Sequence, residues 1–191
     1  MEERNEVPMR KAFFLDRDGV INEEVSYLHT AADTRLIPRA AEAIRMLRDA
    51  GYLAIVATNQ SGVARGYYDL EAVHEVHREI QRQLAEAGAA VDGFYICPHH
   101  PEITGECSCR KPGPGMLLTA AAEHDIDLAE SFMVGDRPGD LEAGVAAGVR
   151  KVFLVRSGYG AEVLAEKRPL PPGTAVADDL LDAVQMALKE D

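Results

Sequence analysis

The sequence contains no tryptophan and only three cysteines among its 191 residues. Few cysteines, in an odd number, argue against the disulfide framework of a small secreted domain. No apolar run approaches the ~20 residues that span a bilayer. The first residues are too acidic for a secretory signal peptide. We therefore expect a cytoplasmic protein without a membrane-spanning segment.

Positive charge is also scarce. Lys and Arg number 20 against 32 Asp and Glu, so the formal net charge is -12. A surface of that charge repels the phosphate backbone of nucleic acid and the head groups of anionic lipids. We expect neither nucleic acid nor a membrane as a partner. Any phosphorylated ligand would need local positive charge from a metal ion, lysine or arginine.

Apolar residues are plentiful enough for a core, at 47% of the chain, with 27% charged residues. These values are typical of globular proteins, and the length suits one domain over residues 1–191. No repeat, low-complexity tract or linker interrupts the chain. No apolar stripe is left without an intramolecular role, so we expect a monomer.

Short apolar runs alternate with helical patterns along the chain. Strands are predicted at 12–15, 53–57, 91–96, 132–134, 152–155 and 174–177. Helices are predicted at 38–50, 69–88, 115–124, 138–147 and 180–189, with a surface loop over 156–173. Alternation of this kind predicts an α/β fold with a Rossmann-like, doubly wound parallel sheet. Ligands of such sheets bind beyond the carboxyl ends of the strands.

Acidic residues follow two of these strands. Asp16 and Asp18 come directly after the first strand, and Asp136 follows the fourth. Carboxylates this close repel each other unless a cation lies between them, and Mg²⁺ prefers oxygen ligands. Asp140 could steady a water on such a metal. The alternative is that Asp16 and Asp18 only cap a turn.

Two further residues are expected at the same edge of the sheet. Thr58 follows the second strand, and its hydroxyl can bind phosphate oxygens. Lys111 brings a positive charge that could offset both Asp16 and phosphate, although a lysine taken alone is more often a surface residue. The order Asp-x-Asp, Thr, Lys, Gly-Asp-x-x-x-Asp at strand ends is far more specific than any of its parts.

The three cysteines lie close together in one loop, residues 97–109. Cys97, Cys107 and Cys109, with His99 or His100, offer three sulfurs and an imidazole, which suit tetrahedral Zn²⁺. Four protein ligands leave no open coordination position on the metal, so the predicted zinc is structural and holds the loop together. Three free cysteines are the alternative.

Four segments of the sequence, LDRDG, ATNQSG, RKPGPG and VGDRPGD, resemble the motifs of the haloacid dehalogenase superfamily of phosphohydrolases. Longer matches, ATNQSGVARG, CPHHP, CSCRKPGPGML and MVGDRPGD, are most similar to its heptose bisphosphate phosphatases. The resemblance covers residues 12–155. It implies a Mg²⁺-dependent phosphatase that removes the C7 phosphate of a heptose 1,7-bisphosphate, and a zinc loop in which His99 is the ligand.

The resemblance also implies roles for the strand-end residues. Asp16 is the expected nucleophile, which becomes an aspartyl phosphate. Asp18 is the expected general acid and then base, and its backbone carbonyl is a Mg²⁺ ligand together with Asp16 and Asp136. Thr58 and Lys111 are expected to hold the phosphoryl group. Mg²⁺ and lysine would neutralise the charge that otherwise repels a carboxylate nucleophile from phosphate.

The connections between the first three strands are too short for a large cap domain, so the site should be open. Substrate contacts are expected from a flap, from the residues beside Thr58 and from two arginines that can bind a second phosphate. These residues are Glu24, Val25, Ser26, Tyr27, Asn59, Gln60, Ser61, Arg110 and Arg137.

Two other functions fit parts of the pattern. A histidinol-phosphatase shares the motifs and the zinc loop, but needs negative groups for the substrate ammonium. A phospho-accepting receiver domain also uses a strand-end aspartate, Mg²⁺, threonine and lysine. It needs neither Asp18 nor a zinc loop.

Overall fold

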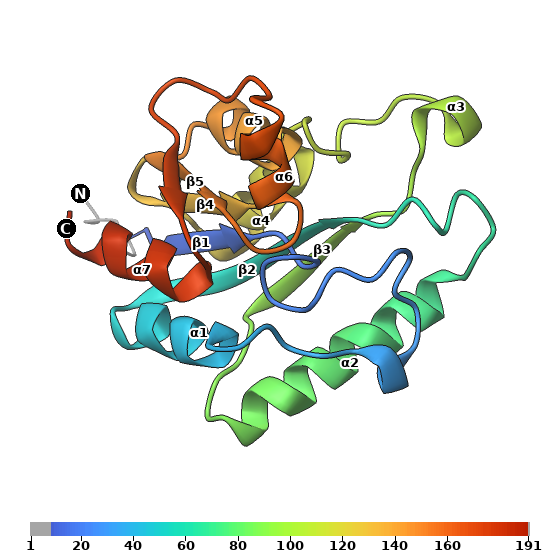
Figure 1. The fold of residues 1–191 in the computed structure, drawn as a ribbon, viewed down its shortest axis with the longest axis horizontal. Coiled ribbons are helices and arrows are strands. Elements are labelled where there is room, and N and C mark those ends of the chain that lie inside the picture. The colour runs from blue at the N-terminus through green and yellow to red at the C-terminus, as the bar shows by residue number, and fades with distance from the viewer. Residues whose placement is uncertain (1–8, 191) are drawn as a thin grey trace, which may run out of the picture.

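A computed structural model describes residues 9–190, which form a six-stranded sheet with helices on both faces (Figure 1). The strand order is β3-β2-β1-β4-β5-β6, and every neighbouring pair is parallel. The strands are β1 Lys11–Leu15, β2 Tyr52–Asn59, β3 Gly93–Cys97, β4 Phe132–Gly135, β5 Lys151–Val155 and β6 Ala175–Ala177. The predicted doubly wound α/β sheet is confirmed.

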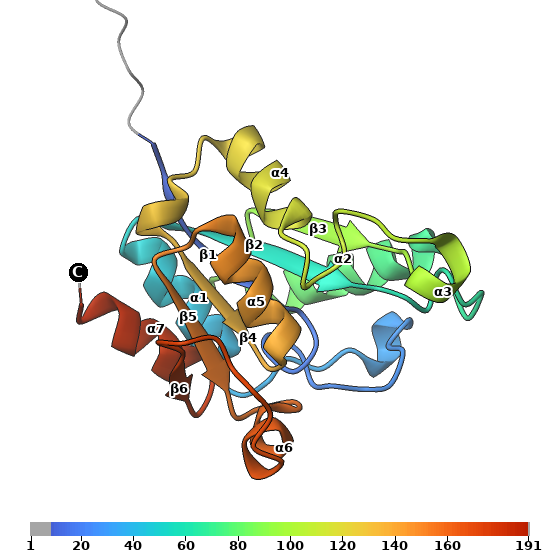
Figure 2. The ribbon, with the colours of Figure 1, turned by 90° about the horizontal axis from the view of Figure 1, so that it is seen from above.

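Seven α-helices connect or flank these strands in residues 9–190. They are α1 Ala40–Asp49, α2 Leu70–Glu86, α3 Pro101–Thr104, α4 Gly115–His124, α5 Pro138–Ala147, α6 Gly160–Ala165 and α7 Leu180–Leu188. Two 3-10 turns, η1 Ala31–Asp33 and η2 Leu128–Glu130, complete the connections. Helices α1, α2 and α7 cover one face of the sheet, and α4 and α5 cover the other (Figures 1 and 2).

The core consists of two apolar layers that the sheet separates. Because successive side chains of a strand point to opposite faces, Phe13 and Leu15 join the layer under α1, α2 and α7. Ala12 and Phe14 join the layer under α4 and α5. All four side chains are fully buried. This burial on both faces holds the end of β1 in a fixed position.

The region 156–173 differs from the prediction, since it contains α6 and is not only a loop. This helix has six residues between glycines and prolines and buries little beyond Gly160 and Val163. It is therefore too short to produce a helical pattern in the sequence. Helix α1 begins at Ala40, later than predicted, because Arg39 before it is left-handed with φ 69°.

The connections from β1 to β3 hold only η1, α1 and α2, so no large cap separates these strands. The carboxyl ends of the strands therefore lie open along one edge of the sheet. Within residues 9–190, no helix is long and apolar enough to cross a membrane.

Candidate active site

Three adjacent strands bring the predicted residues to one edge. Asp16 directly follows β1, Asp136 directly follows β4, and Thr58 is the last residue but one of β2. β2 and β4 both pair with β1, so the three positions lie side by side. One carboxylate oxygen each from Asp16, Asp136 and Asp140 lies within 4.8 Å of the others.

Lys111 lies at the centre of this group, with a side chain only 2% exposed. Its Nζ donates to Asp16 Oδ1 at 2.8 Å and to the Ala57 carbonyl at 2.7 Å, and lies 2.7 Å from Asp140 Oδ1. Burial alone would lower the pKa of Lys111, but the Asp140 and Asp16 carboxylates outweigh it and raise the pKa above its usual value. The lysine is therefore charged.

Asp140 thus has a partner that the sequence did not predict. Its carboxylate pairs with Lys111 and accepts a hydrogen bond from the Arg137 backbone N–H at 3.0 Å, which caps α5. The expected role beside a metal-bound water stays a prediction.

One lysine does not balance this many carboxylates. Burial raises the pKa of Asp16 to about 7, Lys111 opposes the rise, and Asp140 and Asp18 add to it. Burial and the charges of Asp16 and Asp140 raise the pKa of Asp136 to about 8. Asp136 Oδ1 is buried and has no hydrogen-bond partner in the described residues. An unpaired oxygen beside clustered carboxylates fits a bound divalent cation.

The Asp18 carboxylate accepts hydrogen bonds from three side chains. Arg17 donates from Nε to Oδ2 at 3.1 Å and from Nη2 to Oδ1 at 3.0 Å. Asn22 donates to Oδ1 at 2.9 Å, and Gln60 donates to Oδ2 at 3.1 Å. The two hydrogen bonds from one guanidinium, with those from the two amides, fix the orientation of the Asp18 side chain.

Two amide side chains at the carboxyl end of β2, those of Asn59 and Gln60, connect residues of the site by hydrogen bonds. Gln60 Nε2 also donates to Thr58 Oγ1 at 2.8 Å, and its Oε1 accepts from the Tyr68 hydroxyl at 3.0 Å. Asn59 exchanges two hydrogen bonds with the Lys111 backbone, at 3.0 and 3.1 Å. Asn59 therefore positions the segment that carries Lys111.

These side chains line a cavity of about 360 Å³. The lining includes Asp16, Asp18, Thr58, Lys111 and all nine predicted substrate-contact residues: Glu24, Val25, Ser26, Tyr27, Asn59, Gln60, Ser61, Arg110 and Arg137. Five further residues line it that sequence reasoning did not assign to the substrate: Arg17, Leu28, Tyr68, Asp140 and Tyr159. Asp136 is fully buried and lies outside the lining.

The segment after β5 supplies Tyr159, which sequence reasoning left without a role. The Tyr159 N–H donates to Asp136 Oδ2 at 2.8 Å, and the Arg137 guanidinium lies 3.7 Å from the ring centroid. The segment follows a strand next to β4, so the rule that ligands bind at carboxyl ends could have indicated it.

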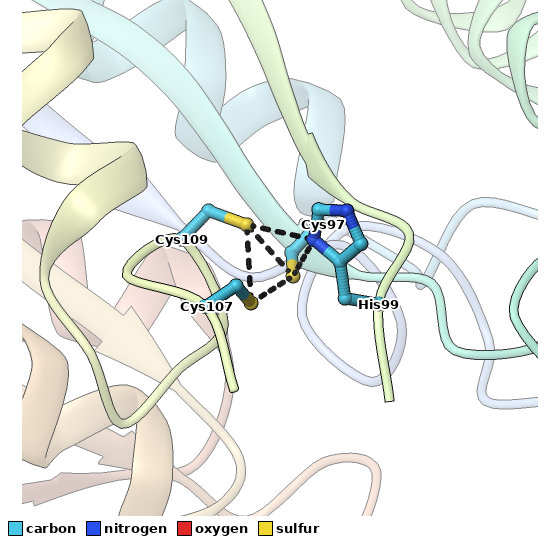
Figure 3. Close-up of side chains that lie close together, drawn as sticks. All are labelled: Cys97, His99, Cys107 and Cys109. Carbon is cyan, nitrogen blue, oxygen red and sulfur yellow. Dashed lines mark hydrogen bonds between the residues drawn. The ribbon is translucent and has the colours of Figure 1, made fainter. Parts of the chain in front are cut away.

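The cysteine loop brings four metal-ligating atoms together (Figure 3). Cys109 Sγ lies 3.0 Å from Cys97 Sγ and 3.5 Å from Cys107 Sγ, and His99 Nδ1 lies 3.3 Å from Cys109 Sγ. Ligands on a tetrahedron around zinc, with Zn–S of ~2.3 Å, lie ~3.8 Å apart. His100 turns away and contacts Arg65 at 2.9 Å. The cluster is compatible with a structural zinc ion.

Comparison with known proteins agrees with this geometry. A family model described as HAD-hydrolase-like matches residues 108–183. D-glycero-D-manno-heptose-1,7-bisphosphate 7-phosphatase of Thermosynechococcus vestitus is 44% identical over 92% of this chain and 94% of its own length. The D-glycero-beta-D-manno-heptose-1,7-bisphosphate 7-phosphatase of Pseudomonas aeruginosa is also 44% identical, over 94% of this chain and 98% of its own.

The chain belongs to the heptose-1,7-bisphosphate 7-phosphatase family. The predicted membership of the haloacid dehalogenase superfamily is confirmed, and the chain is a phosphatase of that type. A solved family member, D,D-heptose 1.7-bisphosphate phosphatase from B. bronchiseptica, superposes with a TM-score of 0.87 at 38% identity. The match covers 95% of this chain and 99% of that one, and that crystal contains magnesium and phosphate.

Proposed function

We propose that this phosphatase removes the C7 phosphate of D-glycero-D-manno-heptose 1,7-bisphosphate through an aspartyl phosphate on Asp16. The observation that carries the proposal is the pairing of Asp16 with Lys111 in a cavity that Arg110 and Arg137 also line. Arg110 donates one hydrogen bond to the His99 carbonyl at 3.2 Å, and the Arg137 guanidinium lies over the Tyr159 ring. Among residues 9–190, neither arginine has a carboxylate within ion-pair distance. Both are therefore available to a second phosphate, and the names of the relatives agree.

The first half of the reaction transfers the phosphoryl group to Asp16. A carboxylate oxygen of Asp16 attacks phosphorus, the bond from phosphorus to the C7 oxygen breaks, and Asp18 gives its proton to that oxygen. The Arg17, Asn22 and Gln60 donors stabilise the carboxylate that Asp18 becomes. Lys111 and the Thr58 hydroxyl hold the transferring group, where electrostatic stabilisation matters most.

The second half regenerates the enzyme. Water attacks the phosphorus of the aspartyl phosphate, Asp18 takes a proton from that water, and the bond between phosphorus and the Asp16 oxygen breaks. Inorganic phosphate leaves, and Asp16 is a carboxylate again. Asp18 thus alternates between acid and base, which suits its position beside the nucleophile.

Two metal ions belong to the proposal. Asp16, Asp136 and the backbone carbonyl of Asp18 would hold Mg²⁺, whose charge would offset that of the carboxylates and of the phosphoryl group. Cys97, His99, Cys107 and Cys109 would hold Zn²⁺, which would fix the loop that leads into Arg110 and Lys111. The chain is proposed to act as one domain on a small sugar phosphate.

The test is phosphate release from heptose 1,7-bisphosphate and from histidinol phosphate, with Mg²⁺ and with excess EDTA. We expect Mg²⁺-dependent release from the bisphosphate, with the 1-phosphate as product. Asp16→Asn should lose turnover completely and keep its circular dichroism spectrum, whereas Asp49→Asn, at an exposed position, should keep full activity. Phosphate release from histidinol phosphate alone would show that the protein is a histidinol-phosphatase. A stable phosphoaspartate without turnover would indicate a phospho-accepting receiver domain.

A further inference from the structure

Arg17 is a fully buried arginine directly beside the acid–base residue. It continues the face of β1 that carries Phe13 and Leu15, so its side chain is directed to the α2 side of the sheet. Burying a guanidinium is unfavourable unless its charge and its N–H groups are paired. Nε and Nη2 of Arg17 are paired with Asp18, as described above.

The remaining nitrogen of the guanidinium is directed to α2. Arg17 Nη1 lies 3.3 Å from His77 Nε2, and both side chains are buried. A guanidinium has only donors, so Nε2 accepts the hydrogen bond, and the ring is neutral with its proton on Nδ1. Burial and the charge of Arg17 lower the pKa of His77 to about 3, which agrees with a neutral ring.

The His77 ring is itself held in place. It stacks on Phe94 of β3 with ring centroids 4.2 Å apart and an angle of 16° between the planes. Its Nδ1 is buried without a hydrogen-bond partner in residues 9–190. An apolar ring would fill the same place without that cost. The polar ring is therefore explained by its other nitrogen, which accepts from Arg17.

We infer that His77 is a positioning residue of the phosphatase: it fixes the Arg17 guanidinium, which in turn holds the Asp18 carboxylate at the acid–base position. The inference rests on the proposed function, because it assigns Asp18 to proton transfer at the leaving oxygen. It extends the site to α2, since His77 acts on the reaction only through Arg17 and Asp18.

Three replacements of His77 separate the hydrogen bond from packing. His77→Phe keeps an aromatic ring to stack on Phe94 but removes the acceptor, and His77→Leu is a second variant without an acceptor. His77→Gln loses the ring but offers an amide oxygen to Arg17. We expect kcat/KM for the bisphosphate to fall about tenfold in His77→Phe, as for partial loss of acid–base catalysis. We expect His77→Gln to restore most of it.

Comparing two substrates with different leaving groups separates a role in proton transfer from a purely structural role. A purely structural role would lower kcat/KM equally for both substrates. A sugar alkoxide needs a proton to leave, whereas p-nitrophenolate leaves without one. The kcat/KM of His77→Phe should therefore fall for the bisphosphate and stay within about twofold for p-nitrophenyl phosphate. His124→Phe, the same change at a histidine of α4 on the other face of the sheet, should leave both substrates unaffected.

A double-mutant cycle tests the route through Arg17. Arg17→Lys keeps the positive charge but loses the two N–H groups that contact Asp18 together, so it should lower kcat/KM for the bisphosphate. Adding His77→Phe to this variant should lower kcat/KM little further. Equal losses for both substrates, full activity of His77→Phe, or no recovery in His77→Gln would each overturn the inference. The proposed function fails separately, if the unaltered protein does not hydrolyse the bisphosphate.

Discussion

At the scale of single residues, Lys111 connects Asp16 to the rest of the site. Its ammonium group contacts Asp16, Asp140 and the Ala57 carbonyl at once. Three acceptors around one point charge match the three donors of an ammonium group, whereas the flat, larger guanidinium of arginine has a different geometry. The site therefore requires lysine itself, and not only a positive charge.

Replacing Lys111 should impair the reaction more than the fold. We expect Lys111→Arg to lower kcat at least about 100-fold, the usual cost of losing one preorganised electrostatic contact at the reacting group. Lys111→Met should also destabilise the protein, because it leaves Asp16 and Asp140 facing each other. Steady-state kinetics and urea unfolding measure the two effects. Lys151→Met, which removes a surface ion pair with Glu190, should alter neither kcat nor the free energy of unfolding strongly.

The raised pKa of Asp136 predicts how stability changes with pH when no metal is present. Between its unfolded value of 3.8 and about 8, the folded state holds a proton that the unfolded state has released. The proton held on Asp136 therefore contributes to the free energy of unfolding in full at low pH. This contribution is lost as the pH rises through that window. Relative to Asp136→Asn, the free energy of unfolding in EDTA should fall by about 1 kcal/mol per pH unit.

Magnesium is the control for this titration. A divalent cation offsets the charge of the carboxylate, so saturating Mg²⁺ should flatten the pH slope of the unaltered protein and leave Asp136→Asn nearly unaffected. An identical slope in both proteins in EDTA would contradict the assignment. Urea unfolding followed by circular dichroism at pH 5, 6, 7 and 8 is sufficient to measure the pH dependence of the free energy of unfolding.

At the scale of elements, the segment between β5 and α6 closely contacts the loop after β1 that contains Gly19. Gly158 has φ +58°, and a Cβ there would lie 2.2 Å from Asp136 Oδ2 and 2.6 Å from Gly19 Cα. Ser157 Oγ donates to the Gly19 carbonyl at 2.7 Å. No side chain fits between the two glycines, so the approach of the loops depends on both.

Gly158→Ala should therefore displace Asp136 and weaken Mg²⁺ binding. Gly148→Ala is the matched control, because Gly148 also has a positive φ, +87°, but has nothing within 4 Å of its added Cβ. Both variants should lose about 1 kcal/mol of stability from backbone strain. Only Gly158→Ala should need more Mg²⁺ for half-maximal activity. Equal Mg²⁺ requirements would refute this account.

The cysteine loop is the other element whose position matters. Metal analysis of the purified protein should find about one zinc per chain, and Cys107→Ser should reduce it. That variant should lower activity indirectly, because Arg110 and Lys111 follow Cys109 without a spacer. Ser61→Ala, which changes a pocket residue outside the cluster, should keep its zinc. A full zinc content in Cys107→Ser would exclude this ligand set.

At the scale of the whole molecule, large exposed apolar side chains are few among residues 9–190. Four of them, Val25, Tyr27, Tyr67 and Leu70, belong to the flap and to the segment from the loop after β2 to the first residue of α2. Tyr27 and Tyr67 of this group contact each other, with ring centroids 4.8 Å apart, and Val25 and Tyr27 line the cavity. The other four, Met9, Ile103, Leu118 and Val145, lie on separate elements and do not make an interface. A monomer stays our prediction, and sedimentation equilibrium should give a mass near 20.8 kDa. A concentration-dependent mass near twice that value would contradict it.

Much of the fold and of the site could be predicted because strong local signals coincide with the strand-end rule. Apolar runs located the strands, and the carboxylates after them located the edge where Asp16 and Asp136 meet. The contact between Arg17 and His77 could not be predicted, since it depends on how α2 packs against the end of β1. Tyr159 was missed although it follows β5, because the Gly- and Pro-rich region 156–173 was predicted to be only a surface loop.

Both ends of the described chain lie far from the cavity. β1 begins at Lys11, and Glu190 pairs with Lys151 at the start of β5, so both ends lie at the amino edge of the sheet (Figure 1). Asp16, Thr58 and Asp136 lie at the opposite edge, where the strands end. A linker that leaves the protein from Lys11 or Glu190 would thus start on the side of the sheet opposite the cavity, and an immobilised form of the enzyme should keep its activity.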